Sequence, residues 1–194
     1  MTILGIETSC DETSAAVIQS GRVKANLIYT QKIHEQYGGV IPELSGRAHL
    51  QKISPLVKTA LKNASVSMEE IDVVAATAGP GLIGSLIVGY NFAQGLALSL
   101  GVPFVPVNHI EGHIYSGFLM DSKPEFPALI LVVSGGHTLL LKVESHTSYT
   151  VLGTTIDDAV GEAFDKVSKL LGLGYPGGPK IQAAADAGEQ GDIR

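Results

Sequence analysis

The sequence predicts an α/β protein in which one pattern of strands and helices starts twice along the chain. Three short apolar segments separated by turns open the chain, and three more begin after residue 127. The first set is followed by two long helical patterns, and each of these is followed by another short apolar segment. Strands that are separated by helices pair in parallel through crossover connections. We therefore expect lobes that combine an antiparallel meander with parallel strands.

The first copy of the pattern is expected to fill residues 1–108. Its elements should be three strands, a helix, a strand, a helix and a strand, at residues 3–6, 15–19, 23–30, 43–62, 72–77, 82–100 and 103–107. The first helix is predicted because apolar residues recur at near-helical spacing along it. The polar stretch at 7–14 interrupts the meander and is typical of a functional loop.

The second copy starts the same βββαβα pattern but does not complete it. Its expected elements are strands at 128–133, 137–143 and 148–154, a helix at 157–171 with an acidic first turn, and a short Ala-rich helix. No crossover strand follows. We therefore expect residues 109–194 to hold one short helix and the first part of a truncated second lobe, which makes the chain a fragment.

Composition limits the function classes. The 194 residues carry 13 basic and 19 acidic side chains, a net charge of −6, which argues against a protein that binds nucleic-acid phosphates unaided. The single cysteine, Cys10, cannot pair within the chain, and no secretory leader is evident. Both observations favour a reducing, cytoplasmic location.

The stretch from Val73 to Ile110 contains no charged residue. Its segment 82–100 is long enough to cross a bilayer. However, a Gly-Pro-Gly sequence opens it, and no basic cluster flanks it. Four polar residues also interrupt it: Ser85, Asn91, Gln94 and Ser99. We expect a helix that is buried or covered by a partner, and no membrane span.

The pair His109 and His113 is the sharpest chemical signal. Histidines at i and i+4 lie on the same face of a helix and can bind one metal ion. Two imidazoles do not complete a site, and Glu111 lies about 200° around the helix from His109, so a third ligand must come from elsewhere. In zinc proteases of the H-E-x-x-H type the glutamate directly follows the first histidine. A surface pair without metal remains the alternative.

The turn Ser134-Gly135-Gly136 joins two apolar strands and exposes backbone N–H groups, which suits a phosphate or carboxylate. An ordinary hairpin turn is the alternative. The polar loop of the first copy occupies the matching position, and its Asp11 and Glu12 could bind a metal or a polar group. We expect the two loops to face each other and clamp the phosphates of a nucleotide.

Two further patterns carry less information. Residues 79–84 match G-x-G-x-x-G, but no acidic residue follows about twenty positions later, so helix packing is favoured over dinucleotide binding. Glu162 and Lys166 form an i,i+4 ion pair, whereas Asp157, Asp158 and Asp165 have no evident partner. Asp165 could contact a ligand or belong to a solvated acidic face.

Taken in order, the motifs resemble those of the TsaD family, the tRNA threonylcarbamoyladenosine transferases once described as O-sialoglycoprotein endopeptidases. The similar segments are GIETSCDET at 5–13, HIEGH at 109–113, VSGGHT at 133–138, EAFDK at 162–166 and YPGGP at 175–179. The resemblance covers essentially the whole chain but only the N-terminal part of the family's length.

The resemblance implies an actin/Hsp70-like ATPase fold with duplicated lobes, the second truncated. It implies transfer of a threonylcarbamoyl group from threonylcarbamoyl-AMP to the adenosine following the anticodon in tRNA. His109 and His113 would bind one divalent metal ion, iron or zinc, and Asp11 and Glu12 would be catalytic. The adenylate, or an ATP-like ligand, would contact Val132, Val133, Ser134, Gly135, Gly136, Asp165 and Gly178.

Some family features are altered or lie outside the chain. Gln182 stands where many relatives have an acidic residue, and this affects one ribose contact. The family's carboxylate metal ligand falls beyond Arg194. The resemblance also implies the partners TsaB and TsaE, which would supply basic surface for tRNA, with the uncharged helix at 82–100 as the candidate partner surface.

Two rival functions stay open at this stage. A metallo-endopeptidase would depend on Glu111, and a non-catalytic nucleotide-binding scaffold would need no metal at His109. We expect the 194-residue chain alone to have little transferase activity.

Overall fold

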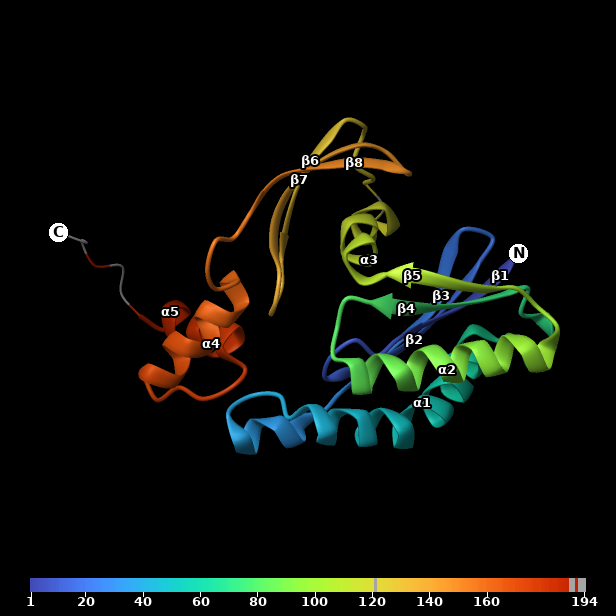
Figure 1. Cartoon of the computed structure of the whole chain (residues 1–194), viewed down its shortest axis with the longest axis horizontal. Coiled ribbons are helices and arrows are strands. Elements are labelled where there is room, and N and C mark those ends of the chain that lie inside the picture. The colour runs from blue at the N-terminus through green and yellow to red at the C-terminus, as the bar shows by residue number, and fades with distance from the viewer. Residues whose placement is uncertain (121, 189–190, 192–194) are drawn as a thin grey trace. The chain divides into compact units, whose positions relative to one another are not determined.

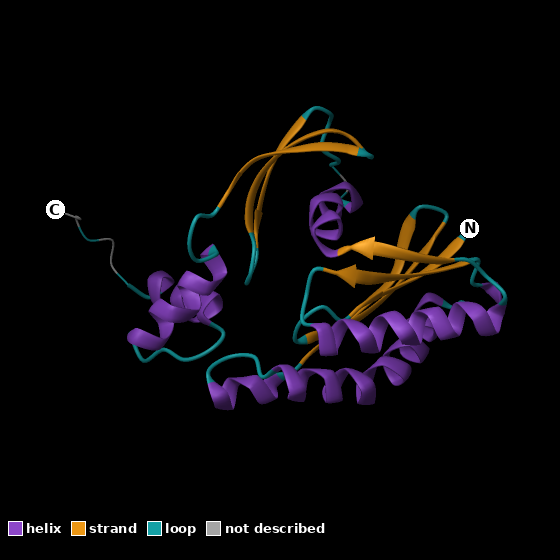
Figure 2. Cartoon of the chain, viewed as in Figure 1, coloured by secondary structure: helices purple, strands orange, loops and turns teal. Residues whose placement is uncertain are grey.

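The computed structural model describes residues 1–120, 122–188 and 191, and its contacts divide the chain into two compact units. Unit 1 comprises Met1–Lys32 and Val40–Asp121, and unit 2 comprises Ile33–Gly39 and Ser122–Arg194. Figure 1 follows the chain through both units, and Figure 2 separates their helices and strands by colour. The helix that carries the histidine pair therefore lies with unit 1.

Unit 1 is built on a five-stranded sheet in the order β3-β2-β1-β4-β5. Strand β1 pairs antiparallel with β2, and β2 pairs antiparallel with β3. Strand β4 pairs in parallel with β1, and β5 pairs in parallel with β4. This confirms the predicted meander followed by crossover strands. The strands are β1 (Thr2–Glu7), β2 (Glu12–Gln19), β3 (Arg22–Thr30), β4 (Val73–Gly79) and β5 (Phe104–Asn108).

Half of the polar stretch at 7–14 belongs to the strands, which corrects the longer loop expected from the sequence. Glu7 ends β1 and pairs with Ser14, while Glu12 already pairs with Thr30 of β3. Backbone hydrogen bonds to the neighbouring strands thus override the turn preference of these polar side chains. Only residues 8–11 form the connecting loop.

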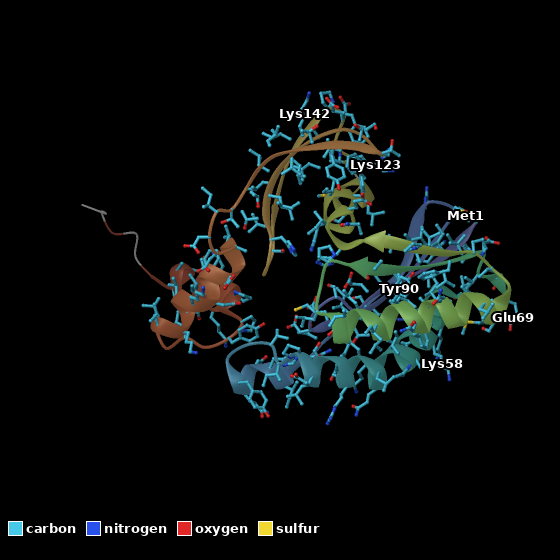
Figure 3. The ribbon with its side chains drawn as sticks, viewed as in Figure 1. Met1, Lys58, Glu69, Tyr90, Lys123 and Lys142 are labelled. Atoms are coloured by element: carbon cyan, nitrogen blue, oxygen red, sulfur yellow. The ribbon has the colours of Figure 1, made fainter. Side chains whose placement is uncertain are left out.

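The helices α1 (Pro42–Ala64) and α2 (Ile83–Leu100) lie side by side on one face of the sheet (Figure 1). Each ends at a residue in the left-handed conformation, Ser65 after α1 and Gly101 after α2. Their inner faces and the sheet form the core, whose fully buried members include Leu4, Val17, Val57, Val74 and Ala93. Tyr90 of α2, labelled in Figure 3, packs edge-to-face on Phe104 with ring centroids 4.9 Å apart.

Small residues form the inner stripe of α2. Its buried positions recur every fourth residue, at Ser85, Gly89, Ala93 and Ala97. A Cβ atom at Gly89 would overlap the side chain of Thr8, whose hydroxyl accepts a hydrogen bond from the Gly89 N–H at 3.1 Å. The helix therefore sits very close to the end of β1, as expected for a Gly-rich packing helix.

The outer face of α2 is apolar and exposed. Ile83 and Leu98 are 78% and 83% exposed, and Ile87 is 54% exposed. By length and composition alone α2 could cross a membrane, yet its inner stripe packs on β4 and α1. The expected burial is therefore confirmed for the inner face of α2. A partner on its outer face stays a prediction.

The remaining elements of unit 1 are short. The helix α3 (His109–Ser116) follows β5 directly and lies on the sheet face opposite α1 and α2 (Figure 1). The 3-10 segments are η2 (Met68–Glu70) and η3 (Gly117–Leu119), and a third, η1 (Lys32–Tyr37), belongs mostly to unit 2.

Unit 2 repeats the meander, which confirms the predicted duplication. Its antiparallel sheet has the order β6-β7-β8, and the two helices that follow pack on each other. The elements are β6 (Ala128–Val133), β7 (Thr138–Ser145), β8 (Ser148–Thr154), α4 (Val160–Leu170) and α5 (Gly177–Asp186).

The start of α4 corrects the predicted helix at 157–171. The helix begins at Val160, so Asp157 and Asp158 precede it. The backbone carbonyl of Asp158 accepts a hydrogen bond from the Thr155 hydroxyl at 2.7 Å, which holds these residues in a turn. Lys166 contacts Asp158 at 2.6 Å and Glu162 at 3.1 Å, so Asp158 has a partner and the predicted Glu162 pair is confirmed.

Apolar side chains remain exposed in unit 2. Leu129, Leu131 and Val133 alternate along one face of β6, and Leu140 is paired with Leu131 on β7. All four are exposed in the described part of the chain. A sheet face of this kind is usually covered by another layer of structure.

The close packing of α2 gives a stability prediction. Replacing Gly89→Ala should lower the free energy of unfolding by about 1–3 kcal/mol, because the buried Thr8 side chain cannot move away. The control Gly95→Ala lies on the same helix with open space around it and should raise the stability by about 0.5–1 kcal/mol. Urea unfolding of the three proteins measures both values. Equal effects at the two positions would contradict the packing described above.

Candidate functional site

A cavity of about 340 Å³ lies on the sheet face of unit 1 that α1 and α2 leave open. Strand pairing places Gly5, Ala16 and Ala75 side by side, and these small residues line it. Polar side chains join them: Glu7 and Thr77 near the carboxyl ends of β1 and β4, Ser14 near the start of β2, and His109 and His113 on α3. The histidine pair thus borders a cavity with a small-residue lining.

The position of α3 is set by the residue before it. The side-chain oxygen of Asn108 accepts hydrogen bonds from the N–H groups of Ile110 at 2.8 Å and Glu111 at 3.3 Å, which caps the helix. His109 and His113 then lie one turn apart. Their Nε2 atoms are 3.1 Å from each other, and their rings are nearly perpendicular, at 81°. The geometry expected from the i,i+4 spacing is present.

This donor set fits a metal ion. Two imidazole nitrogens bound to one tetrahedral zinc at about 2.0–2.1 Å lie roughly 3.3 Å apart, close to the 3.1 Å between these Nε2 atoms. Within the described residues, no cluster of three or more His, Cys, Asp or Glu side chains could hold a metal. The described residues therefore bring together two imidazole nitrogens, and a metal site would need at least one further ligand.

Glu7 anchors the histidine pair to the sheet. One carboxylate oxygen accepts a hydrogen bond from the Ser9 N–H, and the other accepts from the Thr77 hydroxyl and from His109 Nδ1, the last at 3.3 Å. Burial raises the pKa of Glu7, but the hydrogen bonds from His109, Ser9 and Thr77 outweigh it and bring the pKa from 4.5 to about 2. The group is an anion at neutral pH. Sequence reasoning missed this role.

The loop at 8–11 is held by a buried polar network. The carbonyl oxygen of Cys10 accepts hydrogen bonds from the Ser45 hydroxyl, from His49 Nε2 at 2.9 Å and from the Ser85 hydroxyl at 3.2 Å. His49 Nδ1 lies 2.8 Å from the Thr13 hydroxyl. These four side chains are completely buried. They fix the loop to α1 and α2, so part of its polar sequence is structural.

The two carboxylates expected to be catalytic lie at the end of this loop. Glu12 is exposed, and one of its oxygens accepts a hydrogen bond from the Thr30 hydroxyl at 2.9 Å. The backbone carbonyl of Asp11 accepts from the Gln31 N–H at 3.1 Å, and its side chain is half-buried. Neither is among the described residues that line the cavity beside His109. Their catalytic role stays a prediction.

A second cluster forms in unit 2 around the double-glycine turn. The Ser134 N–H donates to the His137 carbonyl at 2.9 Å, which closes the turn, and a Cβ atom at Gly135 or Gly136 would meet open space. The first turn of α4 packs on it. Gly161 donates its N–H to the Ser134 carbonyl at 3.3 Å, and a Cβ atom there would lie 2.6 Å from the same oxygen.

The start of α5 joins the same cluster. Asp165 lies one turn after Gly161 on α4 and accepts a hydrogen bond from the Gly177 N–H at 2.7 Å. A Cβ atom at Gly177 would overlap the carbonyl oxygen of Phe164. Asp165 therefore caps α5. The sequence analysis expected either a ligand contact or a solvated acidic face for Asp165, and neither anticipated this hydrogen bond. Gly178 follows with open space around it.

The turn and the two helix starts make a small-residue surface, in which the N–H groups of Gly161 and Gly177 already donate to the Ser134 carbonyl and to Asp165. Backbone N–H groups at helix N-termini carry partial positive charge and bind phosphates. Of the other residues expected to contact the adenylate, Val132 is buried and Val133 half-exposed on β6. Gln182 donates to Asp186 at 2.7 Å within α5. The requirement for glycine at 161 and 177 was not predicted.

Comparison with known proteins agrees with the resemblance of the motifs. The family model TsaD, tRNA N6-adenosine threonylcarbamoyltransferase, matches residues 22–194. Proteins of that name from Chlorobium limicola and Caldicellulosiruptor saccharolyticus are 55% and 53% identical over 192 residues. The matches cover 97% and 98% of this chain but only 54% and 57% of the relatives. The chain thus spans about half the length of the curated relatives it matches.

Solved structures support the fold. YeaZ from Pseudomonas aeruginosa matches 78% of this chain and 67% of its own, with a TM-score of 0.53 and 23% sequence identity. The expected actin/Hsp70-like α/β fold is confirmed.

The thiol of Cys10 gives a pH-dependent prediction. Cys10 is exposed, but partial desolvation of its thiol and the negative charge of the neighbouring Asp11 raise its pKa to about 12, and the thiolate is the reactive form. Alkylation by iodoacetamide at pH 8 should therefore be at least about 10-fold slower than in the urea-unfolded chain. The rate should rise steadily from pH 7 to 10, and Asp11→Asn should increase it. Levelling of the rate near pH 9 in the folded protein would contradict this assignment.

Proposed function

Because the chain belongs to the TsaD family, we propose that it is the N-terminal portion of a tRNA threonylcarbamoyltransferase. The reaction moves the threonylcarbamoyl group from threonylcarbamoyl-AMP to the exocyclic amine of the adenosine following the anticodon, in t(6)A biosynthesis. The observation that carries the proposal is the imidazole pair, with His109 and His113 Nε2 atoms 3.1 Å apart beside a cavity. In this proposal residues 1–108 form the first lobe, and 109–194 hold the metal-site helix and the start of the second lobe.

The chemistry is acyl transfer to a weak amine nucleophile. The amine nitrogen forms a bond to the carbamoyl carbon, the bond from that carbon to the phosphate oxygen breaks, and AMP leaves. The amine also loses a proton, and Asp11 and Glu12 are the proposed acceptors. An iron or zinc ion held by His109 and His113 would supply Lewis-acid polarisation of the carbamoyl carbonyl.

The adenylate is proposed to bind on unit 2. The backbone N–H groups of Gly135, Gly136 and Gly178 are the proposed donors to its phosphate, because those of Gly161 and Gly177 already donate to the Ser134 carbonyl and to Asp165. The would-be Cβ positions of Gly135, Gly136 and Gly178 are open, which leaves room for a ligand to approach the backbone. Asp165 holds the start of α5 in place. AMP, the leaving group, would be released from this same surface.

Binding of tRNA depends on positive surface, and the overall charge of this chain is negative. Its net charge is −6, and phosphate contacts depend on lysine and arginine. We therefore propose that tRNA binds through a cytoplasmic complex with TsaB and TsaE and through the remainder of the protein. The exposed apolar face of unit 2 at Leu129, Leu131 and Val133 is proposed to pack against the rest of the second lobe.

The outer face of α2 is the proposed docking site for TsaB. Ile83, Ile87 and Leu98 project from it, and a Cβ atom at Gly84 or Gly95 would meet open space. No charged residue occurs anywhere between Val73 and Ile110. The surface of TsaB that contacts α2 should therefore also be uncharged, and we propose that it is a helix. YeaZ shares the fold of this chain, and a protein with that fold can present an equivalent helix.

The transferase proposal is tested with a chimera. Residues 1–194 are joined to the C-terminal part of the Chlorobium limicola relative and supplied with tRNA, threonylcarbamoyl-AMP, metal, TsaB and TsaE. The chimera should form modified adenosine, and His109→Ala should reduce the rate by about 100-fold or more. The control His146→Ala changes a histidine of the β7–β8 turn and should have little effect.

The chain of 194 residues, assayed alongside, should show little activity. If the folded chimera bound the adenylate but made no modified adenosine while the intact relative did, the proposed reaction would be wrong.

The docking proposal is tested by direct binding. Ile87→Glu should weaken association with TsaB at least about 10-fold, because a charge would be buried in an apolar contact. The matched control is Ile28→Glu on β3, since Ile28 is 57% exposed and Ile87 54%. Calorimetric titration of the 194-residue proteins with TsaB measures both. Equal loss in the two variants would rule out α2 as the contact.

A further inference from the structure

We propose that Glu7 is a positioning residue that fixes the His109 ring in the tautomer able to bind metal. In this tautomer Nδ1 carries the proton and donates it to Glu7, which leaves the lone pair on Nε2. The proposal rests on the function proposed above only in that His109 and His113 are taken as the metal ligands.

Glu7 itself is held rigidly. It is the last residue of β1, and strand alternation directs its side chain to the cavity face of the sheet. Three donors converge on its carboxylate: the Ser9 N–H, the Thr77 hydroxyl and His109 Nδ1. Thr77 is buried on the neighbouring strand β4. With both oxygens engaged, the carboxylate cannot rotate away from His109.

The carboxylate determines which nitrogen of His109 carries the proton. The Glu7 oxygen that faces His109 also accepts from the Thr77 hydroxyl, so it acts as an acceptor, and its contact with Nδ1 at 3.3 Å requires a proton on Nδ1. In a neutral ring the lone pair is then on Nε2. That atom faces Nε2 of His113 at 3.1 Å, the position where both rings could reach one ion.

This arrangement is the one that favours ligation. A carboxylate bonded to the distal nitrogen of a ligating histidine fixes the ring orientation and increases the basicity of the ligating nitrogen. Loss of such a partner typically lowers metal affinity by about 10–100-fold. A neutral side chain could also accept hydrogen bonds from Ser9 or Thr77, so these two contacts do not by themselves require an acidic residue at position 7.

The substitution Glu7→Gln gives a specific expectation. The Ser9 N–H is a backbone donor and cannot change its role, so the amide oxygen of the new side chain should face it. The amide NH₂ then faces Thr77, whose hydroxyl can turn to accept, and His109 Nδ1, which must also accept. The His109 proton should therefore move to Nε2 and block metal binding there.

The experiment reads the tautomer directly. The chain is labelled with ¹⁵N-histidine, and two-bond ¹H–¹⁵N correlation spectra at pH 8 identify the protonated nitrogen of His109. The wild type should show the Nδ1–H form and Glu7→Gln the Nε2–H form. Zinc affinity, measured by competition with a chromophoric chelator, should fall about 10–100-fold in Glu7→Gln.

The control Glu111→Gln removes the same charge on α3 itself and should leave the His109 tautomer and the zinc affinity nearly unchanged. A wild-type His109 with its proton on Nε2 would overturn the proposal, even if Glu7→Gln failed to fold. Equal loss of zinc affinity in both variants would also overturn it. These measurements use neither tRNA nor adenylate, so a chimera without transferase activity would refute the proposed function and leave the role of Glu7 to be decided separately.

Discussion

Close approach of backbone segments fixes the loop after β1 in unit 1 and the glycine cluster in unit 2. In unit 1, Gly89 lets α2 contact Thr8, and this places α2 against the loop that leads to Asp11. In unit 2, Gly161 lets the start of α4 touch the double-glycine turn, and Gly177 lets α5 begin against α4. A side chain at any of these positions would push a loop away from a helix. Three of the 23 glycines thus have a steric role at these close approaches.

Much of the fold could be predicted because its signals are local. Alternating apolar segments and turns gave the strands, and the i,i+4 spacing of His109 and His113 gave their shared face. What could not be predicted depends on distant residues. Glu7 meets His109 across 102 positions, and His49 meets Thr13 across 36. Nothing in a sequence of isolated motifs indicates which polar residues will be brought together by a crossover.

The boundary error at α4 has a related cause. Acidic residues favour the first turn of a helix, so Asp157 and Asp158 were placed inside it. In the structure a hydrogen bond from Thr155 holds them in a turn, and Lys166 bonds to Asp158 from the helix. The same charge preference is satisfied from outside the helix, since an aspartate just before the first turn also lies near its N-terminus. The acidic residues therefore predicted correctly that a helix N-terminus lies near Asp157 and Asp158, but predicted the first residue of the helix incorrectly.

The two clusters differ in how much of their task this chain can perform. The proposed phosphate site uses backbone N–H groups of the turn at Gly135 and of the start of α5, which lie within unit 2 beside the N–H groups of Gly161 and Gly177 that already have partners. Binding a metal ion needs a third ligand, and the described residues offer only His109 and His113. The proposed nucleotide site is therefore contained in this chain, whereas the proposed metal site depends on the remainder of the protein. In that proposal Glu7 would offset part of the dependence, because it would orient one ligand before the third binds.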